Sequence, residues 1–87
     1  MKAVITVIGK DMVGILAKVS TACAESNVNV VEVTQSILDK YFAMIMLVDI
    51  QHMECSLDDL KESILQEVPT MTVHVMHEDI FNSMHRI

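Results

Sequence analysis

The sequence is poor in positive charge. Six lysine and arginine residues stand against twelve aspartates and glutamates, which gives a formal net charge of −6. A chain with this balance repels the phosphate backbone of DNA or RNA. Direct nucleic-acid binding is therefore not expected.

The sequence also lacks a cysteine framework and a long apolar run. Its two cysteines, Cys23 and Cys55, form no C-x-x-C motif, as expected of reduced thiols in a cytosolic protein. The N-terminal apolar stretch covers only residues 3–8, which is too short for a signal peptide or a membrane span. We expect a cytoplasmic protein with no membrane partner.

Motifs for catalysis and metal binding are missing as well. No Ser/His/Asp or Cys/His arrangement can be recognised, so we predict no catalytic residue and no enzyme activity. His74 and His77 are three residues apart on a predicted strand and point to opposite faces. His52 and His85 have no partner nearby in the sequence. We predict no metal site and no cofactor.

Apolar residues are what the sequence has in abundance, at 52% of 87 residues. This length is typical of one domain. A domain of this size buries only about 60 to 65% of its unfolded surface, so it lies near the lower limit for folding unaided. The high apolar fraction therefore indicates a dense core or a surface shared with another copy of the chain.

The hydrophobic period changes several times along the chain, between the period of two typical of strands and the helical period of 3.6. The predicted elements are a strand at 3–8, a helix from Met12 or Val13 to Ser26, strands at 28–37 and 41–50, a helix at 57–68, a strand at 70–77 and a short tail helix within 78–87. A turn at Leu38, Asp39 and Lys40 joins the second and third strands into a hairpin.

Local signals predict the helix ends and the faces of these elements. Asp11 can cap the first helix, Ser56 and Asp59 have capping-box spacing, Pro69 ends the second helix, and Asp79 can cap the tail helix. The predicted apolar stripes are Ile15, Leu16, Val19 and Cys23 in the first helix, Val31, Val33 and Ile37 in the second strand, and Ile80, Phe81, Met84 and Ile87 in the tail.

This βαββαβ order predicts a ferredoxin-like α+β sandwich, with both helices on one face of a four-stranded antiparallel sheet. The strand at 41–50 is apolar on both faces, and only one face can meet the helices. The other face must be covered by the tail helix, by a second subunit or by both. A tail helix this short is marginal in water and must dock somewhere, so we predict a homodimer.

The stretch VIGKDMVGILAKVS, followed by NVNVV at 27–31, resembles the first half of ACT domains, which are small amino-acid-sensing modules of metabolic enzymes and regulators. The similarity extends over the chain, including LDKYFAM and IFNSMHRI, and is greatest to stand-alone bacterial and archaeal ACT-domain proteins. The resemblance implies a single ACT domain over 1–87, with a core at 1–77. It also implies a dimer with side-by-side sheets or helices, and effector pockets where the first loop of one copy approaches its partner.

Two glycines bracket the first loop, and their G-x-x-x-x-G spacing is that of a phosphate loop. However, Ile15 and Leu16 stand where phosphate chemistry needs a lysine and a hydroxyl. No G-x-G precedes the helix, so a dinucleotide fingerprint is absent too. The loop is not a nucleotide site.

A zwitterionic ligand fits the loop better. A helix start favours a carboxylate, Lys10 could pair with that carboxylate, and Asp11 could pair with an ammonium group. The resemblance adds Asn29, where family members often place a pocket residue. The candidate ligand-binding residues are Gly9, Lys10, Asp11, Met12, Val13, Gly14 and Asn29. The alternative is that the glycines only shape a turn, Asp11 caps the helix, Lys10 is solvated and Asn29 is an ordinary strand-entry residue.

Two functions follow from these residues and the resemblance. One is a regulatory module that binds an amino acid or similar metabolite at a dimer interface and modulates an enzyme or regulator. The other is a structural module that binds no metabolite and docks its apolar sheet face or tail helix onto another protein.

Overall fold

The computed structural model describes residues 1–10 and 13–84 and has the predicted order of elements. The elements are β1 (Lys2–Gly9), α1 (Ile15–Glu25), β2 (Asn29–Leu38), β3 (Tyr41–Asp49), α2 (Leu57–Glu67), β4 (Thr72–His77) and α3 (Glu78–Met84). The ferredoxin-like prediction is confirmed.

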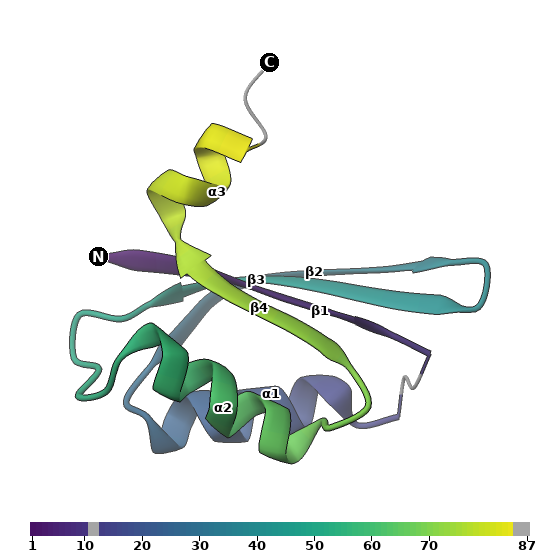
Figure 1. Ribbon diagram of the computed structural model, residues 1–87, viewed down its shortest axis with the longest axis horizontal. Helices are drawn as coiled ribbons and strands as arrows, with labels where there is room; N and C mark the ends of the chain where they lie inside the picture. Colours follow the sequence, from purple (N-terminus) through teal and green to yellow (C-terminus); the bar gives the residue numbers. More distant parts are fainter. Residues whose placement is uncertain (11–12, 85–87) are drawn as a thin grey trace.

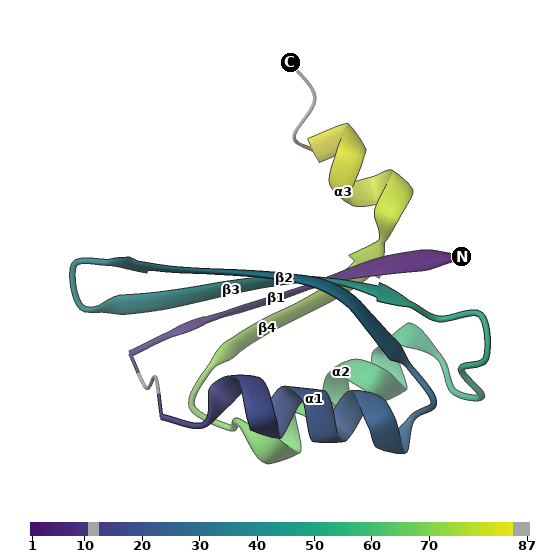
Figure 2. The same ribbon diagram turned by 180° about the vertical axis from the view of Figure 1, so that it is seen from behind.

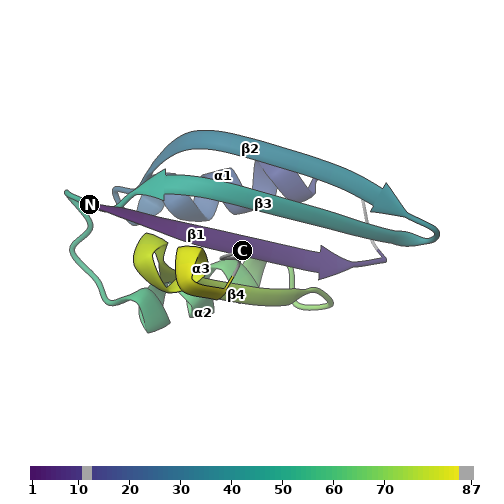
Figure 3. The same cartoon turned by 90° about the horizontal axis from the view of Figure 1, so that it is seen from above.

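The strands form one antiparallel sheet in the order β2-β3-β1-β4. Both crossover helices, α1 and α2, cover one face of this sheet, whereas α3 rises from the opposite face (Figures 1 and 2). Viewed from above, α3 stands over β1 and β4 (Figure 3), and it contacts both strands. We call the face that carries α3 the outer face.

The core lies between the sheet and the two crossover helices. Strand β3 sends one set of side chains into it, and these are at most 5% exposed: Phe42, Met44, Met46 and Val48. They meet buried residues of the helices such as Ile15, Leu60 and Ile64. No polar or charged side chain is buried among residues 1–10 and 13–84, so burial of apolar surface is the main source of stability.

Helix α1 begins later than predicted. Gly14 occupies its N-cap with φ 69° and has no side chain to cap it, so the predicted start at Met12 or Val13 is wrong. Asp11, the predicted cap, lies outside the described residues. The buried stripe also differs, because Ala22 is buried and Leu16 is 38% exposed. A start at Ile15 is favoured because Gly14 takes a left-handed conformation that a helix cannot continue.

The face predicted for β2 is wrong at Val31. A β-bulge between Val30 and Glu32 adds one residue to the strand, which reverses the alternation at that point. Val30 and Val33 therefore pack against the core, and Val31 is 48% exposed. Ile37 does face the same side as Val33, but it is 65% exposed because the hairpin extends beyond the helices (Figure 1).

Helix α2 has the predicted capping box. The Asp59 backbone N–H donates to Ser56 Oγ at 3.1 Å, and the Ser56 backbone N–H donates to Asp59 Oδ2 at 3.4 Å. The helix ends at Glu67, with Val68 as its C-cap, just before Pro69. These reciprocal bonds satisfy two backbone donors at the helix start.

Two boundaries near the C-terminus differ from the prediction. Strand β4 begins at Thr72 instead of residue 70. Helix α3 follows β4 directly and begins at Glu78, so Asp79 lies in its first turn and is not a cap. Of the predicted tail stripe, Phe81 is partly buried, Ile80 and Met84 are exposed, and Ile87 lies outside the described residues.

Ser56→Ala removes the capping hydroxyl and is expected to lower the free energy of unfolding by about 1 kcal/mol. Urea denaturation monitored by circular dichroism measures this change. Ser63→Ala is the matched control: Ser63 lies within α2, where alanine is a better helix former, and this variant should be neutral or slightly stabilised. Equal losses in both variants would contradict a role for the cap.

Candidate functional site

The predicted ligand loop joins the end of β1 to the start of α1. Gly9 ends the strand, Lys10 follows it, and Val13 is 82% exposed just before the N-cap Gly14. Asp11 and Met12 lie outside the described residues. The described part of the loop thus places Lys10 and the helix start at the same end of the sheet.

Glycine is favoured at positions 9 and 14 for two different structural reasons. A Cβ on Gly9 would overlap the end of the Met71 side chain, so a larger residue here would force that side chain to move. Gly14 has open space around it, since Lys18 Cε, at 4.0 Å, is the nearest neighbouring atom that a Cβ would meet. Its positive φ is what favours glycine there. Gly14 therefore leaves the start of α1 uncovered by any side chain of its own.

Lys10 is not simply solvated. Its Nζ atom lies 5.8 Å from the centroid of the Tyr41 ring, within the range of a cation–π interaction. This contact links the loop to the first residue of β3 and holds a positive charge at the end of the sheet.

Asn29 lies at the other end of the sheet. It pairs with Asp49, which in turn pairs with Lys2, whereas Gly9 pairs with Phe42. The seven-residue offset along the strands corresponds to about 23 Å at about 3.3 Å per residue. One chain therefore does not bring Asn29 to the loop, and the two could share a ligand only if different copies supplied them.

The histidines are dispersed as their spacing indicated. His74 pairs with Thr6 and lies on the outer face, and His77 pairs with Ala3 on the alternate side of the strand. Within residues 1–10 and 13–84, no group of three or more His, Cys, Asp or Glu side chains is placed to hold a metal ion. None of the helices in the described ranges has the length and apolar character needed to cross a membrane.

Cys23 is part of the core, as its position on the helix stripe predicted. It is fully buried, and this burial raises the pKa of its thiol from 9.0 to about 11. Because the folded-state pKa is the higher one, the stability that the neutral thiol contributes is complete below pH 9. It is lost as the pH rises through 11. Cys55 is a free, half-buried cysteine.

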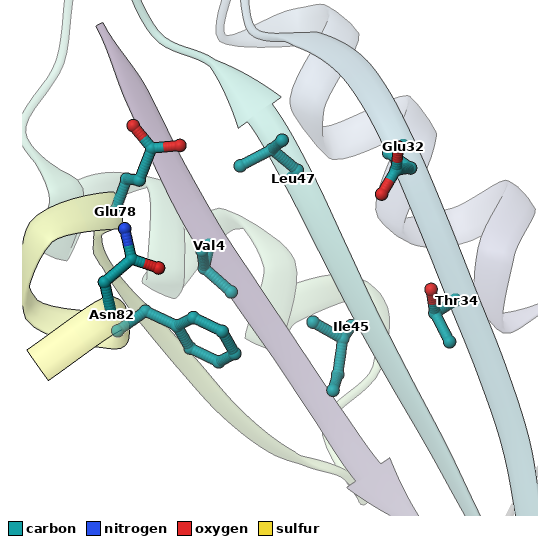
Figure 4. A pocket seen from close by; sticks show the side chains of 8 residues that line it. Val4, Glu32, Thr34, Ile45, Leu47, Glu78 and Asn82 are labelled. Atoms are coloured by element: carbon teal, nitrogen blue, oxygen red, sulfur yellow. The ribbon is translucent and has the colours of Figure 1, made fainter. Parts of the chain in front are cut away.

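The structure also has a concave surface that no sequence motif predicted. Between α3 and the outer face of the sheet lies a polar-rimmed hollow (Figure 4), lined by Val4, Glu32, Thr34, Ile45, Leu47, Glu78, Phe81 and Asn82. Val4 is only 4% exposed although it lies outside the main core. The apolar outer face of β3 was the signal in the sequence for this second surface.

A second, more apolar groove adjoins this hollow. It has a volume of about 350 Å³ and is lined by Thr6, Ile8, Ala43, Ile45, His74, Met76, Phe81 and Met84. We call it the α3 groove. Ile45 and Phe81 line both concavities, so the two adjoin each other.

The βαββαβ order and the single antiparallel sheet place this protein among the small ferredoxin-like α+β domains. Residues 2–78 match the model of an ACT domain family. The chain belongs to the ACT domain family.

Relatives of similar length support this assignment. The chain is 51% identical to a UPF0237 protein of Clostridium perfringens, with all of both chains covered. It is 43% identical to a UPF0237 protein of Methanocaldococcus jannaschii, which covers 99% of this chain and 98% of the relative. The structure of an ACT domain protein from Streptococcus pneumoniae matches with a TM-score of 0.77 at 33% identity, covering 93% of each chain.

Gly14→Ala places a Cβ at a positive φ and is expected to lower the free energy of unfolding by about 1 to 2 kcal/mol. Gly14→Asn should cost less, because asparagine enters the left-handed region more readily. Chemical denaturation of the two variants beside the parent chain tests this order. If alanine were tolerated as well as asparagine, the left-handed N-cap would not be a constraint.

Thiol titration at pH 8 with an aromatic disulfide reagent should find one reactive cysteine in the folded protein. Cys55 is half-buried and free, whereas Cys23 is buried and has a raised pKa. The second thiol should react only after unfolding in denaturant, and Cys55→Ser should remove the fast reaction. Rapid modification of Cys23 in the folded Cys55→Ser variant would contradict the burial.

Proposed function

We propose that this protein is a non-catalytic regulatory module. It binds an amino acid or a similar small zwitterion at an interface between two copies and modulates a partner enzyme or regulator. Family membership supports a sensing role, and the observation that carries the proposal is the uncapped start of α1, which lies at the same end of the sheet as Lys10.

Helix α1 has neither a side-chain cap nor an acidic residue in its first turn. The positive end of its dipole therefore has no anion from its own helix, and such a helix start stabilises a bound carboxylate. Lys10 adds a full positive charge at the same end of the sheet. Together they make a suitable environment for the carboxylate of an amino acid.

The ammonium group of the ligand needs acceptors. Asp11 follows Lys10 in the sequence and is the proposed partner for that group. Asn29 offers an amide oxygen, but about 23 Å of sheet separates it from Gly9 in one chain, by the rise per residue of a strand. In this proposal, Asn29 comes from the second copy, which makes the dimer necessary for a complete site.

The alternative function is a protein-docking module with no metabolite. The observation that favours it is apolar surface left exposed on the outer face and α3, where Ile8, Ile45, Ile80 and Met84 are each at least 42% exposed. Such surface commonly marks a site of association. The same surface is compatible with a dimer, so it does not by itself replace the sensing role.

A thermal-shift screen across the amino acids tests the sensing function. A ligand at 100 times its Kd should add about 2.7 kcal/mol to the free energy of unfolding. Lys10→Ala and Asp11→Ala should abolish this stabilisation. Lys61→Ala is the matched control, since it removes the same charge from α2 and should leave the ligand response intact.

The absence of any saturable response at millimolar amino acid would reject the sensing function. If Lys10→Ala and Asp11→Ala then left binding of a partner protein unchanged, whereas Ile80→Asp or Met84→Asp abolished it, the docking function would be correct.

A further inference from the structure

Two adjoining concavities on the outer face differ in character. The α3 groove, of about 350 Å³, has only two polar side chains in its described lining, Thr6 and His74. Small-ligand pockets typically measure about 300 to 1,000 Å³ and are mostly apolar with a few polar groups. The polar-rimmed hollow has a volume of about 230 Å³ and contains four polar side chains: Glu32, Thr34, Glu78 and Asn82. We call it the acidic hollow.

Strand register explains why the two concavities adjoin. Pairing across β2, β3 and β1 places outward-facing residues in two successive rows: Glu32, Leu47 and Val4, then Thr34, Ile45 and Thr6. Neighbouring strands lie about 4.8 Å apart, so Glu32 and Val4 are about 10 Å apart across the first row. Ile45 stands in the second row and lines both concavities. It gives the acidic hollow and the α3 groove a shared apolar contact.

The polar side chains of the acidic hollow come from two elements. Glu32 and Thr34 belong to β2, whereas Glu78 and Asn82 belong to α3. The two pairs lie on opposite sides of the apolar residues that form the floor of the hollow (Figure 4). A small molecule on this floor would therefore have protein oxygen atoms on two sides.

These four polar side chains have unused hydrogen-bonding capacity. None of them makes a hydrogen bond or an ion pair within residues 1–10 and 13–84. Ionised glutamate side chains accept hydrogen bonds and cannot donate them. Neither concavity has a lysine or an arginine among its described lining residues. The acidic hollow therefore complements a cationic donor such as a protonated amine, and it repels an anion.

The two carboxylates of the hollow have different surroundings. Glu78 also borders a concavity whose lining includes Met1 and Lys2, so positive charge lies near its other side. Glu32 does not line that concavity. Strands β2 and β3 contain no lysine or arginine, so Glu32 has no basic neighbour on its own strand or on the strand beside it. We therefore expect Glu32 to contribute more than Glu78 to the binding of a cation.

We propose that the acidic hollow and the α3 groove together bind a small organic amine. The protonated amine lies in the acidic hollow beside the Glu32 carboxylate. The apolar body of the ligand lies over Ile45 and Phe81, which line both concavities, and extends into the α3 groove. The volume of the groove suits a single aromatic ring or a short branched chain.

This site is separate from the proposed amino-acid site. It lies on the outer face, whereas α1 covers the other face of the sheet and the loop after Gly9 lies beyond the end of β1 (Figures 1 and 2). The ligand also differs, because the carboxylate of an amino acid would be repelled by Glu32 and Glu78. The inference therefore does not rest on the proposed function.

Titration of the ¹⁵N-labelled full chain, followed in two-dimensional ¹H–¹⁵N NMR spectra, tests the site. The probes are phenethylamine, which has an aromatic body, and isoamylamine, which has a branched aliphatic one. Saturable shifts are expected at the backbone amides of Ile45, Leu47 and Phe81, and none at Gly14. Hydrocinnamate has the aromatic body of the first probe with a carboxylate in place of the amine, and it should leave these amides unchanged.

Charge removal tests the role of Glu32. Glu32→Gln keeps the size of the side chain and should raise the Kd for phenethylamine about two- to fivefold, the range of an exposed ion pair. Glu78→Gln should raise this Kd less. The matched control is Glu62→Gln, which removes an exposed carboxylate from α2, on the other face of the sheet, and should leave the Kd unchanged.

An ammonium attached to the protein should compete with the ligand. Ile45→Lys places one at the shared contact of the two concavities and should raise the Kd for phenethylamine about tenfold or more. The matched control is Ile37→Lys, on the same hairpin but on the opposite face of the sheet, and it should bind the amine as the parent chain does. The dispersion of the same NMR spectra verifies that each variant is folded.

Several results would overturn the inference. The first is the absence of saturable shifts with either amine at millimolar concentration, and the second is equal binding of hydrocinnamate. Shifts confined to the loop after Gly9 would also overturn it, because they would place the amine at the proposed amino-acid site. None of these results rejects the sensing function, which the thermal-shift screen with amino acids tests separately.

Discussion

A sheet that is apolar on both faces, with crossover helices for only one of them, is the constraint on which the rest of this structure depends. Strand β3 is the clearest case, because Met44 and Met46 are fully buried on one side and Ile45 is 42% exposed on the other. A right-handed βαβ crossover places α1 and α2 on the same side. Among the described residues, α3 contacts β1 and β4 on the outer face and leaves Ile8 and Ile45 partly exposed.

The parts of the candidate site lie at opposite ends of the sheet. The loop after Gly9 and the start of α1 lie at one end, and Asn29 and the base of α3 lie at the other. This separation follows from the antiparallel pairing of β1 with β3 and of β3 with β2.

Several features could be predicted from the sequence because their signals are local. The Ser56–Asp59 capping box, the two-residue turn at Asp39 and Lys40, and the alternation in β3 each depend on residues close together in the chain. Other features depend on distant contacts or on an added residue. The bulge at Val31 reverses the face of β2, and nothing in the alternating pattern signals it. The late start of α1 depends on the left-handed conformation of Gly14.

The sequence by itself determined the order of elements, the ferredoxin-like class, the position of Cys23 in the core, and the unsuitability of the first loop for phosphate. Periodicity and composition suffice for these because they act through local backbone preference and burial. Only the tertiary structure decided that Asn29 lies far from Gly9, that Lys10 stands over Tyr41, and that α3 leaves an apolar groove beside it. Strand register and helix placement set these distances, and both depend on contacts between residues remote in sequence.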